Sequence, residues 1–203
     1  MADELARGRV PFVGLTGGIG SGKSEALAAF GRLGAATLSS DLVVHELLAS
    51  DELSGMIEDR LGADIAAGGF VDRDRLGAIV FEDDDQREWL EGVLWPRVAA
   101  HIASWRERLV AGGRSPRLAI VEVPLLFESE MEEIFDFTVV VVADEALSAA
   151  RATARGHTAV GLRAERQLGQ REKAQRADYV VVNDGDLADL ERQLSRLVET
   201  IAA

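Results

Sequence analysis

The sequence predicts an α/β protein built on a doubly wound, parallel, five-stranded sheet. Five short segments are rich in β-branched residues and lack a clean polar–apolar alternation, which is typical of strands buried on both faces. Helical patterns separate most of these segments, and alternation of strand and helix indicates a parallel sheet covered by helices. The predicted strands are Val10–Leu15, Ala36–Ser39, Leu118–Val123, Thr138–Val142 and Tyr179–Val182.

Three helices are predicted to cover this sheet. The first, Lys23–Leu33, has an apolar face and ends near Gly34, a residue type that commonly terminates helices. The other two, Asp144–Arg155 and Asp186–Ile201, each begin with an aspartate, which suits the start of a helix.

The long stretch between the second and third strands contains no convincing strand. It is predicted to form helices over Asp51–Leu61, Arg73–Phe81 and Gln86–Leu109, broken at Gly68-Gly69 and interrupted by Pro96. We therefore expect one folding unit over 1–203. Its parts would be a core (8–48 and 115–203), a helical acceptor-binding insertion (about 49–112) and a basic helical lid (about 151–176).

Composition narrows the function further. The 203-residue chain has a net charge of −13, which argues against a general nucleic-acid binder. It has no cysteine, and therefore no disulfide or thiolate metal site. The sequence contains no apolar run long enough for a membrane span and no signal segment within Met1–Arg9. We expect a cytoplasmic protein that binds small molecules, and composition predicts no particular oligomeric state.

The strongest motif is a glycine-rich loop that begins after the first strand and opens the first helix. The run Gly17-Gly18-Ile19-Gly20-Ser21-Gly22-Lys23-Ser24 matches G-x-x-x-x-G-K-[ST]. Glycines let successive backbone N–H groups converge on phosphate oxygens, and the helix N-terminus adds further donors. Lys23 can bridge the β- and γ-phosphates of ATP, and the Ser24 hydroxyl can bind Mg²⁺. The pattern predicts a P-loop of the NTPase type.

A P-loop alone does not separate kinases from switches or motors. The guanine-reading and Asp-x-x-Gly motifs expected of a GTPase switch are absent from the segments that follow the late strands and the third strand. A motor or transporter ATPase is usually larger. A small ATP-dependent kinase fits better.

A kinase also needs a carboxylate close to the acceptor hydroxyl. Asp41 follows the second strand, at the end of the sheet where a ligand is expected. Asp41 could instead serve as the N-cap of a helix over Leu42–Leu48, and the two roles are compatible.

The sequence resembles the dephospho-CoA kinase family over almost its whole length. The resemblance rests on the P-loop run beginning at Gly14, on Asp41 with His45, on Val123-Pro124-Leu125-Leu126-Phe127-Glu128, and on further residues in family order. These further residues are Asp72-Arg73, Leu76, Val80-Phe81, Pro96, Arg151, Arg155, Gln167, Lys173, Ala177-Asp178-Tyr179, Asn183 and Gly185.

This resemblance implies transfer of the γ-phosphate of ATP to the 3′-hydroxyl of dephospho-CoA, with Mg²⁺ bound at Ser24. It implies that Asp41 is the general base, that Lys23 and Arg151 stabilise charge on the transferred group, and that Arg155 belongs to the lid. The predicted ATP contacts are Gly18, Gly20, Ser21, Gly22, Lys23, Ser24, Glu25 and Arg155, and the predicted acceptor contacts are Thr16, Asp41, His45 and Trp95.

Three positions depart from the family pattern. Ser39 stands where a second aspartate is usual, Trp95 replaces a histidine before Pro96, and Glu25 follows Ser24 where a hydroxyl residue is common. His45 could be an acceptor contact or a helix-surface histidine, and Trp95 could line the acceptor pocket or belong to the core. Two other functions therefore remain open: a kinase for another nucleoside-like or small alcohol acceptor, and a non-catalytic nucleotide-binding regulator.

Overall fold

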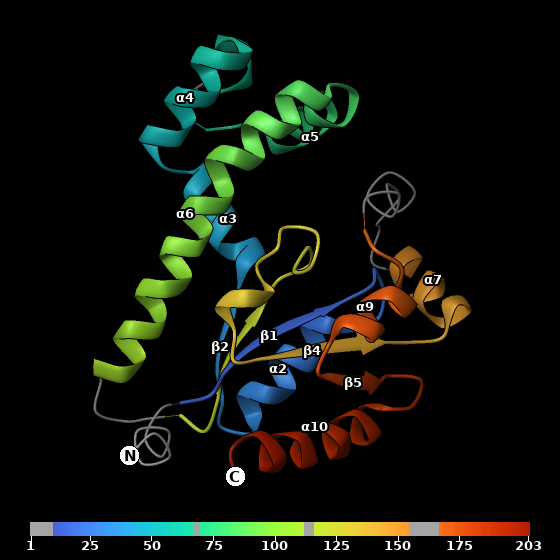
Figure 1. Cartoon of the computed structure of the whole chain (residues 1–203). Helices are drawn as coiled ribbons and strands as arrows, with labels where there is room; N and C mark the ends of the chain where they lie inside the picture. The colour runs from blue at the N-terminus through green and yellow to red at the C-terminus, as the bar shows by residue number, and fades with distance from the viewer. Residues whose placement is uncertain (1–9, 67–69, 112–115, 155–166) are drawn as a thin grey trace. The chain divides into compact units, whose positions relative to one another are not determined.

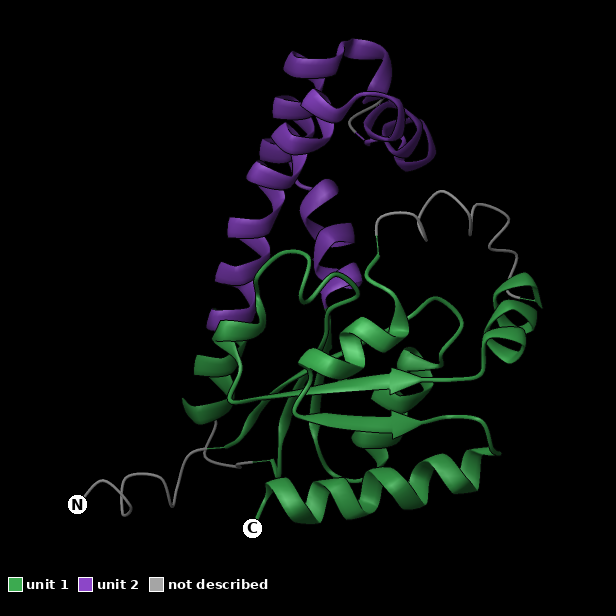
Figure 2. Cartoon of the chain, turned by 45° about the vertical axis from the view of Figure 1, so that its right-hand side comes forward, with its two compact units in different colours: residues 1–39, 104–203 green, residues 40–103 purple. Residues whose placement is uncertain are grey.

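The computed structural model describes residues 10–66, 70–111, 116–154 and 167–203, and Figure 1 shows their helices and strands. The chain divides into two compact units, coloured separately in Figure 2. Unit 1 combines residues 1–39 with 104–203, and unit 2 comprises residues 40–103. Predictions that concern residues 1–9, 67–69, 112–115 and 155–166, including that for Arg155, lie outside the described residues.

Unit 1 contains a sheet of five parallel strands in the order β2-β3-β1-β4-β5. The strands are β1 (Phe12–Gly17), β2 (Ala36–Ser39), β3 (Ala119–Glu122), β4 (Phe137–Val142) and β5 (Tyr179–Val182). All of β1 is buried because it lies in the middle of the sheet. The predicted α/β class and five-stranded parallel sheet are confirmed.

The two faces of β1 pack against different helices. Val13 and Leu15 belong to an apolar core with residues of α2 (Lys23–Arg32) and α10 (Leu187–Ile201). Successive side chains of a strand point to opposite faces, so Thr16 faces the other way, where its hydroxyl meets Lys173 of α9 (Gln170–Arg176). Helices therefore cover both faces of the sheet, as the doubly wound class requires.

Aspartates precede two of the helices in unit 1. Asp144 Oδ1 accepts hydrogen bonds from two backbone N–H groups in the first turn of α7 (Glu145–Ala154). Asp186 caps α10 and forms a reciprocal capping box with Asp189. These side chains satisfy N–H groups that have no partner within the helix, and the predicted helix starts are confirmed.

The described residues of unit 2 form helices joined by short turns, without a strand. Its helices are α3 (Ser40–Leu48), α4 (Asp51–Leu61), α5 (Arg73–Glu82) and most of α6 (Asp84–Ala111), and a short 3₁₀ turn, η1, spans Ala63–Ile65. They enclose a separate apolar core that includes Leu53, Ile57 and Leu76. None of the helices in the described part of the chain combines the length and the apolar composition that crossing a bilayer requires.

The structure corrects two sequence-based expectations. Pro96 was expected to interrupt a helix, yet α6 continues through it. Leu90, Leu94 and Val98 are buried at four-residue spacing on both sides of the proline, so packing outweighs the backbone hydrogen bond that proline cannot make. Asp41 is not an N-cap, because α3 begins at Ser40 and Asp41 lies within its first turn.

Candidate functional site

The glycine-rich loop joins the end of β1 to the start of α2 (Figure 1). Gly22, the N-cap of α2, has a left-handed backbone with φ of 95°, and a Cβ there would collide with the side-chain amide of Asn183. Gly20 also has a positive φ, of 75°, and a Cβ there would collide with the carbonyl of Ser148. Both positions therefore require glycine. The loop leaves the first backbone N–H groups of α2 without intrahelical partners, which makes its start suitable for an anion.

Two side chains at the start of α2 carry the chemistry expected of a phosphate cradle. Lys23 Nζ donates a hydrogen bond of 2.8 Å to the carbonyl oxygen of Gly18. Ser24 Oγ donates one of 3.2 Å to Glu122 Oε1. Beside them, the hydroxyl of Ser21 is buried and has no hydrogen-bond partner within the described residues.

Glu122 is a site residue that the sequence-based prediction did not select. Glu122 is the last residue of β3, which pairs with β1 in the sheet, and it is only 6% exposed. Its carboxylate beside the P-loop hydroxyl has oxygen atoms of the chemical type that Mg²⁺ prefers. The available signal was a glutamate at the end of an otherwise apolar strand, Ala119–Glu122.

Arg151 reaches the same region from α7. Its Nη1 donates a 2.9 Å hydrogen bond to the carbonyl oxygen of Asn183, and Asn183 Nδ2 donates one of 2.8 Å to the carbonyl oxygen of Ser21. A hollow of about 210 Å³, lined by Gly22, Glu25, Arg151 and Asn183 among others, adjoins these groups. Asn183 thus links a candidate catalytic arginine to the P-loop.

Glu25 turns toward the other end of its own helix. Its carboxylate pairs with Arg32 at 3.2 Å, and Arg32 also pairs with Glu191 of α10. The hydrogen bond to Glu191 raises the pKa of Arg32 above its ordinary value, and the hydrogen bond to Glu25 adds a smaller increase. The negative charge of Glu25 is therefore partly balanced by Arg32.

Thr16 lies inside unit 1 and is fully buried. Its hydroxyl donates to the carbonyl oxygen of Pro124 at 3.3 Å and lies 3.5 Å from Lys173 Nζ. Lys173 is itself fully buried and forms an ion pair of 2.9 Å with Glu128. Desolvation lowers the pKa of Lys173, and Glu128 opposes that shift. The structure thus places Thr16 in a buried polar network.

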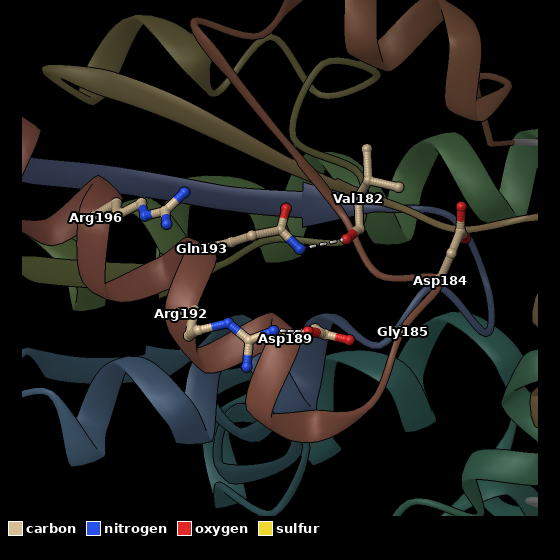
Figure 3. Close-up of a pocket in the computed structure, with 7 residues that line it drawn as sticks. All are labelled: Val182, Asp184, Gly185, Asp189, Arg192, Gln193 and Arg196. Atoms are coloured by element: carbon tan, nitrogen blue, oxygen red, sulfur yellow. Dashed lines mark hydrogen bonds and ion pairs between the residues drawn. The ribbon is translucent and has the colours of Figure 1, made fainter.

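A larger hollow, of about 460 Å³, lies between the end of β5 and α10. Figure 3 shows its lining, in which Gln193 donates to the carbonyl oxygen of Val182 and Arg192 pairs with Asp189. It shares Gly185 with the smaller hollow but is lined by neither Lys23 nor Arg151. The larger hollow therefore contains none of the predicted site residues.

The predicted acceptor residues other than Thr16 lie in unit 2. Asp41 is exposed in the first turn of α3, and His45 lies one turn further along the same helix. His45 Nδ1 is 2.8 Å from a guanidinium nitrogen of Arg73, which begins α5. Trp95 is partly buried and packs against the core of unit 2. The structure thus brings His45 and Arg73 together and joins Trp95 to the core.

One family model and several known proteins resemble the chain over most of its length. Residues 11–189 match the family model described as dephospho-CoA kinase. A dephospho-CoA kinase of Protochlamydia amoebophila is 35% identical over 193 residues, which cover 93% of this chain and 95% of the relative.

Two solved structures are similar as well. A crystal structure from Thermus thermophilus gives a TM-score of 0.81 at 31% identity and covers 95% of this chain and 98% of that one. A dephospho-CoA kinase from Campylobacter jejuni gives a TM-score of 0.61 at 24% identity and covers 94% of this chain and 96% of that one. The second likeness supports the fold alone.

Proposed function

Because the chain belongs to the dephospho-CoA kinase family, we propose that it transfers the γ-phosphate of ATP to the 3′-hydroxyl of dephospho-CoA. The products are CoA and ADP. The observation that carries this proposal is the family match over residues 11–189, which spans the P-loop, Asp41 and Arg151. The geometry of the P-loop supports the donor half of the reaction.

ATP binds at the start of α2 in this proposal. Backbone N–H groups of the loop contact the phosphates, and Lys23 Nζ, which donates to the Gly18 carbonyl, also contacts the β- and γ-phosphates. The hollow beside Gly22, Glu25 and Arg151 offers space for the rest of the nucleotide. The proposed ATP contacts in the described residues are Gly18, Gly20, Ser21, Gly22, Lys23, Ser24 and Glu25.

Ser24 and Glu122 fit a Mg²⁺ ion, since a hydroxyl and a carboxylate oxygen already lie 3.2 Å apart there. Ser24 and Glu122 would hold the ion, which would offset the negative charge that develops on the phosphate oxygens during transfer. Both residues belong to unit 1, so the proposed ion is held on the donor side.

In the transfer step, Asp41 accepts the proton of the 3′-hydroxyl. The hydroxyl oxygen forms a bond to the γ-phosphorus, and the bond from that phosphorus to the β–γ bridging oxygen breaks. ADP leaves with the electron pair of the broken bond. Lys23 and Arg151 stabilise the negative charge on the transferred group. The exposed position of Asp41 supports its access to a substrate.

The remaining assignments complete the proposal. His45 and Trp95 contact the acceptor, the helical insertion (about 49–112) encloses it, and the lid (about 151–176, including Arg155) covers ATP. A cytoplasmic location is part of the same proposal. The Arg73 guanidinium beside His45 supports an acceptor that carries phosphate groups.

A coupled ADP-release assay with several acceptors tests this function. We expect turnover with dephospho-CoA, Mg²⁺-dependent, with CoA identified as the product by mass spectrometry. The comparison acceptors are adenosine and a small sugar alcohol, and a Lys23→Met variant serves as the inactive control. Turnover only with another acceptor, or ATP binding with no turnover at all, would contradict the proposal.

A further inference from the structure

The helix α9 (Gln170–Arg176) has two polar side chains that contact other parts of unit 1. Gln170 and Lys173 are three residues apart and therefore lie on one face of the helix. The helix packs against β1, the strand that leads into the P-loop, and against β4, which pairs with β1. The contacts of these two side chains connect α9 to the donor site.

Lys173 fixes the helix in place. Its Nζ donates to the carbonyl oxygen of Pro124 at 2.7 Å and pairs with Glu128 at 2.9 Å. The same Glu128 oxygen accepts a 2.8 Å hydrogen bond from the backbone of Leu168, just before the helix. Because Lys173 is fully buried, this network cannot be replaced by water without opening the structure.

Gln170 lies one turn earlier and uses both ends of its amide. Its Oε1 accepts a 2.9 Å hydrogen bond from the backbone N–H of Ala143, and its Nε2 donates one of 3.2 Å to the carbonyl oxygen of Ala143. Two bonds to one residue define the position of the side chain more strictly than one. The stem of Gln170 is thereby held against the P-loop.

The contact with the P-loop is at Gly18. A Cβ built on Gly18 would lie 2.7 Å from Gln170 Cγ and 3.1 Å from Cδ. Gly18 is not among the glycines with a positive φ, so its backbone could accept another residue. The nearest atoms that exclude a side chain there are those of Gln170.

Gly18 is also the hydrogen-bond partner of the Lys23 ammonium group. Its carbonyl oxygen accepts from Lys23 Nζ at 2.8 Å and from the backbone N–H of Ser21 at 3.3 Å. A small displacement of this carbonyl would therefore move both the lysine and the loop that contacts phosphate.

We propose that Gln170 is a positioning residue of the donor site, acting through Gly18 on Lys23. Gln170 holds the Gly18 peptide in the position from which the loop and Lys23 bind the β- and γ-phosphates. The inference rests on the proposed role of this loop as the ATP site. It predicts that substitutions at Gln170 weaken the binding of ATP and leave the binding of the acceptor unchanged.

The first test is Gln170→Met, which keeps the length of the side chain and removes both hydrogen bonds to Ala143. We expect the KM for ATP to rise about three- to tenfold, the effect of losing roughly one net hydrogen bond. The KM for dephospho-CoA should stay within about twofold, since Gln170 belongs to unit 1 and is not one of the proposed acceptor contacts. The matched control is Gln175→Met, because Gln175 lies on the exposed side of the same helix. We expect this control variant to have the same KM values as the parental chain. Unchanged KM values for both substrates, or an equal rise in both, would overturn the role.

A double-mutant cycle provides a second test that does not depend on Gln170→Met folding well. Gly18→Ala places a methyl group against Gln170 and should weaken binding of a non-hydrolysable ATP analogue, measured by calorimetry. Combining it with Gln170→Ala removes the obstructing atoms. We expect the double variant to bind the analogue more tightly than the sum of the single effects predicts. Strict additivity would rule out the proposed coupling.

The calorimetric measurement needs no acceptor, so it separates this inference from the proposed function. If the parental chain binds the analogue but makes no CoA, the proposed acceptor is wrong, and the cycle still decides the role of Gln170. If ATP affinity responds as predicted while turnover with dephospho-CoA is normal in the parent, both proposals stand.

Discussion

Individual side chains in both units carry the chemistry proposed for this chain. In unit 1, Ser24 and Glu122 are adjacent although they are 98 residues apart in the sequence. In unit 2, Asp41 is exposed at the start of α3. Because each residue has a distinct proposed role, replacing each one should affect a different kinetic quantity.

Asp41→Asn should lower the transfer rate by about 10²–10⁴-fold, the usual contribution of a general base. ATP affinity should remain nearly parental, since the phosphates are bound by the loop and Lys23. Steady-state kinetics with calorimetry of ATP binding measure both quantities. Asp51→Asn is the matched control, because Asp51 is also exposed in the first turn of a helix of unit 2. Near-parental turnover of Asp41→Asn would remove Asp41 from the role of base.

Glu122→Gln should raise the Mg²⁺ concentration needed for half-maximal turnover by about tenfold or more, within the range seen when residues around a metal are changed. The amide keeps an oxygen for the Ser24 hydroxyl but removes the negative charge that attracts the ion. A Mg²⁺ titration at saturating ATP measures the effect. Ser24→Ala should act in the same direction, and an unaltered Mg²⁺ dependence in Glu122→Gln would exclude Glu122 as a ligand.

At the scale of elements, side-chain packing determines the length of α6 and the stability of α9. Burial of Leu90, Leu94 and Val98 keeps α6 continuous through Pro96. The much shorter α9 depends instead on the ion pair between the fully buried Lys173 and Glu128. An isolated helix of that length is not stable in water, so α9 should be sensitive to the loss of this pair.

Lys173→Met should lower the free energy of unfolding by about 3–5 kcal/mol, because it leaves the largely buried carboxylate of Glu128, 14% exposed, without its cation. Urea denaturation followed by circular dichroism measures the change. Adding Glu128→Gln should restore much of the loss, since glutamine removes the charge and keeps an acceptor for the Leu168 N–H. The control Arg171→Met, on the exposed side of α9, should change the free energy by no more than about 0.5 kcal/mol. Equal effects of Lys173→Met and Arg171→Met would contradict the importance of the pair.

At the scale of the whole molecule, the chain consists of two units with separate apolar cores. The donor groups Lys23, Ser24 and Glu122 belong to unit 1, whereas Asp41, His45 and Trp95 belong to unit 2. The proposed function therefore assigns one substrate mainly to each unit.

Hydrogen exchange measured with each ligand tests that assignment. A non-hydrolysable ATP analogue should slow exchange in peptides that cover 14–26, and dephospho-CoA should slow exchange within 40–103. The reason is that a ligand stabilises the segments to which it binds relative to their open forms. A peptide from the C-terminal half of α10, which contains none of the proposed ligand contacts, serves as the internal control. Protection by dephospho-CoA confined to unit 1 would contradict the acceptor role of unit 2.

The sequence by itself determined the features that depend on neighbours along the chain. The P-loop was found because strand, glycines, lysine and helix follow one another, and the starts of α7 and α10 were found because Asp144 and Asp186 cap their own helices. The five strands were recognised because each is a short run rich in β-branched residues. Only β1, β3 and most of β4 are buried as that pattern predicts, whereas the edge strands β2 and β5 are partly exposed.

Only the tertiary structure decided which of these segments meet. The strand order β2-β3-β1-β4-β5 places β3 beside β1 and so brings Glu122 to Ser24 of the P-loop. The pairing of Lys173 with Glu128 and the contact of Gln170 with Gly18 likewise join distant segments. Such contacts follow from the order in which strands pair and from the face to which each side chain points, and neither property is recorded in a short stretch of sequence. The P-loop could therefore be located from its own residues, whereas the side chains that support it could be identified only in the fold.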